Sequence, residues 1–93
     1  VAVTVLLVED EALVRDMVQQ FLERAGCVVT AAVDAEQALV ASAAEGGRFD
    51  VLVTDVMLPG KTGVQLATIL RRSQPALKVL YVSGNLGETV DRR

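Results

Sequence analysis

The stretch VLVTDVMLPGKTG, residues 51–63, joins a short apolar run to a loop rich in glycine and proline. Its opening residues are apolar or β-branched, which predicts a strand over residues 51–55. Pro59 and Gly60 then interrupt the pattern and mark an irregular loop. A helix over residues 63–73 is expected to follow. Asp55 therefore stands where a strand ends and a loop opens to solvent.

The same alternation continues on both sides of this stretch. Residues 1–8 are almost continuously apolar, which predicts a strand buried on both faces. Residues 11–25 place apolar side chains at helical spacing, with Asp10 as the expected N-cap and Gly26 as the stop. Further elements are expected over residues 27–32 (strand), 34–45 (helix) and 77–84 (strand).

The order of these elements is βαβαβαβ with short connections. This order is typical of an α/β fold, in which right-handed crossovers place helices on both faces of a parallel sheet. The length of 93 residues predicts a single domain over residues 1–93. Residues 85–93 are expected to begin another loop and helix.

Composition excludes several classes of function. The 12 acidic and 9 basic residues give a net charge of -3, so no basic surface for nucleic acid or anionic lipid is expected. The chain has no histidine, which excludes histidine-based metal sites and Ser/His or Cys/His catalysis within it. One cysteine, Cys27, cannot form an internal disulfide, so a reducing, cytoplasmic setting is expected. No apolar run approaches the ~18 residues of a membrane span.

Acidic and hydroxyl side chains follow three of the predicted strands. Glu9 and Asp10 end the first strand, Asp55 ends the third and Ser83 ends the fourth. Ligands of open parallel sheets bind outside the carboxyl ends of the strands. Carboxylates gathered there repel one another unless a cation lies between them. Mg²⁺ fits best, because it takes one or two carboxylates and leaves room for phosphate oxygens.

Each of these residues also has an ordinary structural explanation. The acids at 9–11 could simply favour the positive end of a helix dipole, and Ser83 could be a turn residue. The letters GKT do not make a Walker loop, because its first glycine would fall at Asp55. Met57 and Tyr81 are expected to be packing residues. The joint occurrence of acids and hydroxyl at strand ends favours a functional site.

Three motifs resemble one known family. VLLVEDE (5–11), TDVMLPGKTG (54–63) and VLYVSGN (79–85) are similar, in this order, to the receiver domain of bacterial response regulators and hybrid histidine kinases. The resemblance covers essentially the whole chain, and D-x-x-x-P-x-x-x-G from Asp55 to Gly63 is its most specific part. It implies a flavodoxin-like, CheY-like doubly wound sheet with strand order 2-1-3-4-5. The family's fifth strand, its lysine and its last helix are absent here, so we expect an incomplete domain with an apolar edge.

The resemblance also implies roles for individual residues. Asp55 would be the phosphoacceptor and Ser83 the switch hydroxyl. Asp10 would bind Mg²⁺ directly, Glu9 directly or through water, and Met57 through its backbone carbonyl. The implied partners are a histidine kinase or histidine phosphotransfer domain and an effector domain or protein, and a homodimer is left open.

Other functions stay open at this point. A haloacid-dehalogenase-type phosphatase would carry a second aspartate where this chain has Met57, and an FMN module would carry a Ser/Thr-rich loop after the first strand. Asp10, Asp55 and Ser83 argue against a receiver-like interaction module that takes no phosphate, although the missing lysine keeps this alternative open. The chain is also compatible with the receiver part of a hybrid histidine kinase, whose signal and output the sequence does not identify.

Overall fold

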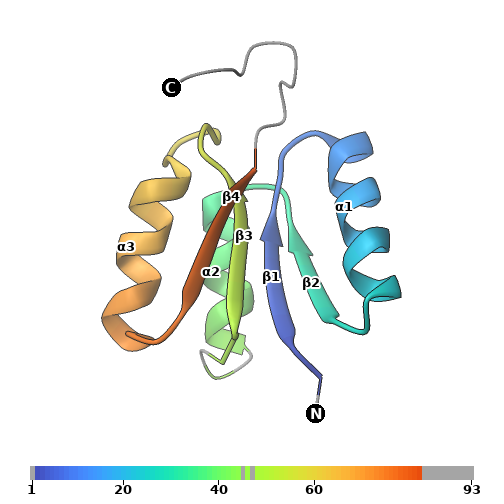
Figure 1. The fold of residues 1–93 in the computed structure, drawn as a ribbon. Coiled ribbons are helices and arrows are strands. Elements are labelled where there is room, and N and C mark those ends of the chain that lie inside the picture. Colours follow the sequence, from blue (N-terminus) through green and yellow to red (C-terminus); the bar gives the residue numbers. More distant parts are fainter. Residues whose placement is uncertain (1, 45, 47, 83–93) are drawn as a thin grey trace, which may run out of the picture.

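The computed structural model of the chain describes residues 2–44, 46 and 48–82. Strands and helices alternate along this part of the chain (Figure 1). They are β1 (Thr4–Val8), α1 (Ala12–Arg24), β2 (Val28–Ala32), α2 (Ala35–Ala44), β3 (Val51–Asp55), α3 (Gly63–Ser73) and β4 (Lys78–Val82). The predicted order is confirmed, whereas Ser83 and the predicted elements after it lie outside the described residues. None of the described helices is long and apolar enough to cross a membrane.

All four described strands are parallel, in the order β2-β1-β3-β4. The predicted order 2-1-3-4 is therefore confirmed. The first crossover places β2 on one side of β1, and the second places β3 on the other side. Sheets with such a change of direction form a crevice at the carboxyl ends of the two strands where it occurs. Here those strands are β1 and β3.

The side chains of each strand alternate between two cores, one on each face of the sheet. Leu6 and Val8 join the larger core with residues of α2 and α3. Val5 and Leu7 join a smaller core, against which side chains of α1 pack. Helices therefore cover both faces, as the element order predicts (Figure 1).

The helix α1 packs less deeply than its apolar spacing indicates. None of its residues is fully buried, and only the side of Val18 and Leu22 contacts the smaller core. Leu13, Met17 and Phe21 are 81%, 64% and 73% exposed. These three residues follow one another at four-residue spacing and so form a stripe along the helix. Only part of the apolar face of α1 is therefore covered by the sheet in the described structure.

Two other predictions about packing are wrong. Met57 and Tyr81, expected to pack inside, are 71% and 41% exposed. Met57 belongs to the loop after β3, and Tyr81 lies on β4, which has only β3 as a neighbour in the described sheet. Leu80 on the same strand is also exposed among the described residues, whereas the predicted apolar edge stays a prediction.

A hydrogen-bonded clasp joins the strand starts at the opposite end of the sheet. The carboxylate of Asp50 accepts from the backbone N–H of Thr4 at 2.9 Å and from its hydroxyl at 3.0 Å. The N–H of Asp50 donates to the carbonyl of Thr4 at 2.9 Å. Because the first two bonds favour the charged carboxylate, the backbone bond most, they lower the pKa of Asp50.

Leu66 and Leu13 offer a matched test of the described packing. Leu66→Ala is expected to lower the free energy of unfolding by about 2–5 kcal/mol, because it leaves a cavity in the larger core. Leu13→Ala makes the same change at an exposed helical position and is expected to cost less than about 0.5 kcal/mol. Urea denaturation followed by circular dichroism measures both values. Equal losses in the two variants would contradict the burial described here.

The clasp predicts a specific dependence of stability on pH. The pKa of Asp50 is lower in the folded chain than its ordinary value of 3.8. The charged carboxylate therefore contributes to the stability of the fold above that pH. The contribution is lost as the pH falls through the folded pKa. Asp50→Asn is therefore expected to lose stability near neutral pH and to show a shallower decline in acid. Melting temperatures on both sides of pH 3.8 test this, and parallel curves for the two proteins would refute it.

Candidate functional site

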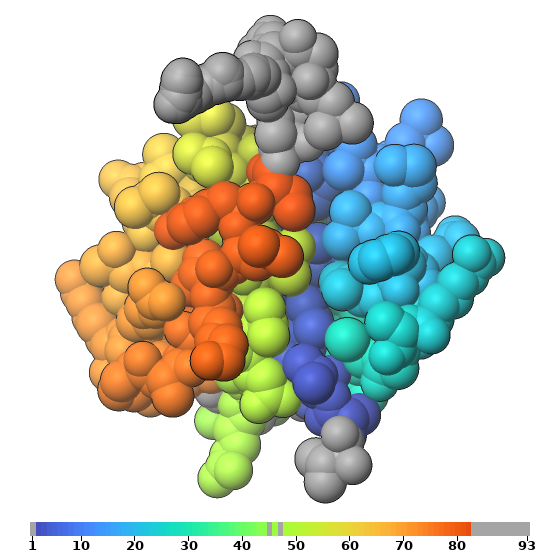
Figure 2. All heavy atoms as spheres, viewed as in Figure 1, coloured from blue at the N-terminus to red at the C-terminus, as the bar shows by residue number. Residues whose placement is uncertain are grey.

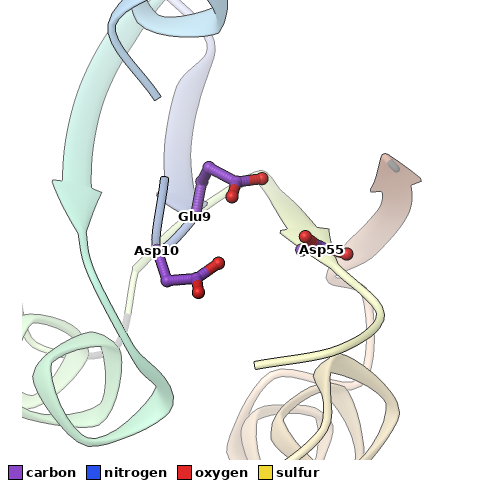
Figure 3. Close-up of side chains that lie close together, drawn as sticks. All are labelled: Glu9, Asp10 and Asp55. Carbon is purple, nitrogen blue, oxygen red and sulfur yellow. The ribbon is translucent and has the colours of Figure 1, made fainter. Parts of the chain in front are cut away.

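Three carboxylates meet at the carboxyl end of the sheet, as the sequence predicts. Glu9 and Asp10 directly follow β1, and Asp55 is the last residue of β3 (Figure 3). One oxygen of each side chain lies within 4.8 Å of the others. The register of the sheet causes this convergence, because Val8 of β1 lies opposite Thr54 of β3. The residues that follow this pair therefore extend from neighbouring strand ends.

Glu9 is the buried member of the cluster, with 0% of its surface exposed. Its Oε2 accepts a hydrogen bond from the N–H of Glu11 at 3.0 Å. Its Oε1 is buried and has no hydrogen-bond partner among the described residues. A buried carboxylate oxygen without a donor is costly unless it meets a positive charge.

The pKa of Glu9 also indicates that the cluster, as described, lacks a compensating positive charge. Burial does most to raise the pKa of Glu9, whereas the hydrogen bond from the N–H of Glu11 lowers it. The nearby charges of Asp55 and Asp10 raise it further. The cluster thus has an excess of negative charge that a cation would relieve.

Asp55 and Asp10 leave the cluster open to approach from solvent. Asp55 is half-buried and Asp10 is exposed. The Oδ1 of Asp55 accepts a hydrogen bond from the N–H of Met57 at 3.3 Å. This bond holds the carboxylate over the loop that follows β3. A ligand can therefore reach Asp55 and Asp10, while Glu9 closes the inner side.

Gly63 explains the last position of the aspartate–proline–glycine pattern. Its N–H donates to the carbonyl of Val56 at 2.7 Å, which brings the start of α3 against the end of β3. A Cβ at this position would overlap the backbone carbonyl oxygen of Asp55. That carbonyl also accepts a hydrogen bond from the hydroxyl of Thr54 at 2.9 Å. The backbone of Asp55 is therefore fixed by contacts that only glycine permits.

Neighbouring features hold the same loop. Gly60 has a φ of 83°, a conformation that favours glycine. Thr62 and Gln65 form a capping box at the start of α3: the Thr62 hydroxyl accepts from the N–H of Gln65 at 3.1 Å. In return, the side-chain oxygen of Gln65 accepts from the N–H of Thr62 at 2.9 Å. The loop between Asp55 and α3 thus ends in a defined geometry.

Other site predictions have different outcomes. Asp10 is not the N-cap of α1, because Glu11 occupies that position without a side-chain cap. The side chain of Asp10 instead belongs to the acidic cluster (Figure 3). The carbonyl of Met57 as a metal ligand stays a prediction. Ser83 lies outside the described residues, although it directly follows Val82, which pairs with Asp55.

The sequence interpretation overlooked Arg15. Its guanidinium donates a hydrogen bond to the backbone carbonyl of Glu9 at 2.9 Å. Arginine six residues after a strand-end acid is no recognised motif, so only the position of Arg15 in the first helix could have drawn attention to it.

The donors present fit a hard divalent cation. The three side chains offer only carboxylate oxygens, and the buried Oε1 of Glu9 has no hydrogen-bond donor among the described residues. Oxygen donors of this kind suit Mg²⁺, Ca²⁺ or Mn²⁺ better than softer metals. A site with few protein ligands and an open side is typical of Mg²⁺ sites that share the ion with a phosphate group.

Comparisons with known proteins agree with this geometry. The family profile described as the response regulator receiver domain matches residues 5–92. The chain is 40% identical over 81 residues to the sensor kinase CckA of Brucella abortus, covering 87% of this chain and 9% of that protein. It is 41% identical over 81 residues to the probable transcriptional regulatory protein TcrX of Mycobacterium tuberculosis, covering 87% and 34%. The chain therefore spans about a third or less of these relatives.

A solved structure shows the same architecture. The chemotaxis response regulator CheY4 of Vibrio cholerae is 31% identical to the chain and superposes with a TM-score of 0.73. The match covers 95% of this chain and 76% of that one.

Glu9→Gln tests the electrostatic account of the cluster. Because the pKa of Glu9 is raised, its charged form costs stability above the ordinary value of 4.5, and this cost grows as the pH rises through the folded pKa. The variant is therefore expected to melt at a higher temperature than the unmodified chain at neutral pH without added metal. Added Mg²⁺ should stabilise the unmodified chain more than the variant. Thermal melts with and without Mg²⁺ measure both effects, and a lower metal-free melting temperature for Glu9→Gln would contradict the account.

Proposed function

Because the chain belongs to the response regulator receiver domain family, we propose that it accepts a phosphoryl group on Asp55 in a two-component phosphorelay. The observation that carries this proposal is the convergence of the Asp55, Glu9 and Asp10 carboxylates at one sheet edge. The open side of that cluster leaves Asp55 accessible to a donor.

Asp55 acts as the nucleophile. Its Oδ1 is held by the N–H of Met57, while no described residue donates a hydrogen bond to its Oδ2. An oxygen of Asp55 attacks the phosphorus of a phosphohistidine, so that an O–P bond forms as the N–P bond breaks and the imidazole leaves. The fixed backbone of Asp55 limits the orientations of the attacking oxygen, which favours an in-line approach.

Glu9, Asp10 and Asp55 would hold Mg²⁺, with the backbone carbonyl of Met57 as a further donor. When bound, the ion supplies positive charge that offsets the carboxylates and the transferred phosphoryl oxygens. Glu9 would form the buried side of the site, where its Oε1 has no hydrogen-bond donor among the described residues. Exposed Asp10 can adjust to the ion and its water. The positions of these side chains, rather than new covalent chemistry, are what the protein contributes.

Ser83 is the proposed switch. In the sequence it directly follows Val82, whose partner in the sheet is Asp55, the proposed phosphoacceptor. A phosphoryl group on Asp55 offers new acceptors for that hydroxyl. Movement of Ser83 toward them alters the segment after β4 and with it the surface that a partner recognises.

The proposed partners follow from this chemistry. The donor is a histidine kinase or a histidine phosphotransfer domain, and the recipient of the signal is an effector domain or protein in the cytoplasm. The relatives include a protein named as a sensor kinase and one named as a probable transcriptional regulatory protein, which supports partners of both kinds.

Mass spectrometry of the intact chain tests the phosphoacceptor. Treatment with phosphoramidate and Mg²⁺ is expected to add the mass of one phosphoryl group to the unmodified chain and none to Asp55→Asn. Asp50→Asn removes the same charge from the residue before β3 and is expected to keep the adduct at a temperature where the variant is folded. An adduct that persists in Asp55→Asn, or its absence from the unmodified chain, would refute the assignment.

A further inference from the structure

The turn between β1 and α1 carries two of the three carboxylates, and its backbone decides where they point. The N–H of Glu9 donates to the carbonyl of Ala32 at 3.1 Å, which continues the pairing of β1 with β2. The Oε2 of Glu9 accepts from the N–H of Glu11. The side chain of Asp10 is exposed and belongs to the short turn between β1 and α1, so its position depends on the peptide units beside it.

Arg15 contacts this turn in two places. Its backbone N–H donates to the carbonyl of Glu11 at 2.9 Å, as the first turn of α1 requires. Its side chain turns back, and Nη1 donates to the carbonyl of Glu9 at 2.9 Å in a partly buried bond. Arg15 therefore ties both ends of the acidic turn to the helix.

We propose that Arg15 is a positioning residue for the acidic site. Its guanidinium fixes the peptide between Glu9 and Asp10, so that both carboxylates stay directed at Asp55. This inference rests on the proposed function, because it concerns how well the site binds Mg²⁺. Without the guanidinium, the carbonyl of Glu9 loses its side-chain donor beside a fully buried side chain. The peptide can then rotate, and Asp10 moves with it.

The choice of acceptor supports this role. A guanidinium is always charged and pairs readily with carboxylates. In the described residues, however, Arg15 donates to a carbonyl and to none of the three acidic side chains. The carboxylate oxygens therefore stay available for a cation, while the turn that bears them is held. A direct ion pair with Asp10 would instead compete with the metal.

Calorimetric titration with Mg²⁺ tests the proposal in three variants. Arg15→Met keeps an unbranched apolar stem and good helix propensity but removes the donor. Arg15→Lys keeps a donor and the charge. Arg24→Met removes the same charge from the last turn of the same helix, far from the turn. Thermal melts without metal show that each variant is folded at the temperature of the titration.

Arg15→Met is expected to bind Mg²⁺ about tenfold more weakly, as is usual when a residue that orients a metal ligand is removed. Arg15→Lys should recover most of the lost affinity, and Arg24→Met should bind within about twofold of the unmodified chain. Affinity of Arg15→Met within about twofold of the unmodified chain would overturn the proposal. So would an equal loss in Arg24→Met, or no recovery in Arg15→Lys.

The same experiment separates this inference from the proposed function. If the unmodified chain binds Mg²⁺ and takes the phosphoryl group while Arg15→Met binds equally well, only the role of Arg15 is wrong. If the unmodified chain neither binds Mg²⁺ nor takes the phosphoryl group, the proposed function fails and the role of Arg15 fails with it.

Discussion

The parallel pairing of β1 with β3 is the constraint on which the rest of the structure depends. Its register sets Val8 opposite Thr54 and so places the carboxylates of Glu9 and Asp55 at adjacent strand ends. Burial does most to raise the pKa of Glu9, and repulsion from the nearby charges of Asp55 and Asp10 raises it further. The backbone hydrogen bonds of the sheet, and the apolar side chains packed on its two faces, hold the acids close together despite that repulsion. A bound cation would lower this electrostatic cost of gathering the carboxylates.

The molecule supports this arrangement on both sides. On the β3 side, Gly63 lets α3 begin against the backbone of Asp55. On the β1 side, Arg15 holds the carbonyl of Glu9. The space-filling view shows how little the described structure covers the sheet between α1 and β4 (Figure 2). The buried core behind the site is thus concentrated on the face of α2 and α3.

Much of this arrangement could be predicted from the sequence. The alternation of apolar runs with helical spacing gives the strand order once the family resemblance is added, and acids at strand ends must share an edge in a parallel sheet. The exposure of Leu13, Met17 and Phe21 could not be predicted. Periodicity tells which residues share a face of a helix, but not how much of that face a neighbour covers. The bond from Arg15 to a backbone carbonyl has no sequence signal either, because any residue can supply the acceptor.

The central claim is that acids from two separate strands converge on one divalent cation. Paramagnetic broadening of backbone amide signals by trace Mn²⁺ tests it most directly in a nuclear magnetic resonance spectrum of the labelled chain. The account predicts that the amides of residues 9–11 and 55–57 broaden first and together, and that excess Mg²⁺ reverses the effect. Broadening confined to one of these two segments, or centred instead on the acids at 34–36, would contradict it.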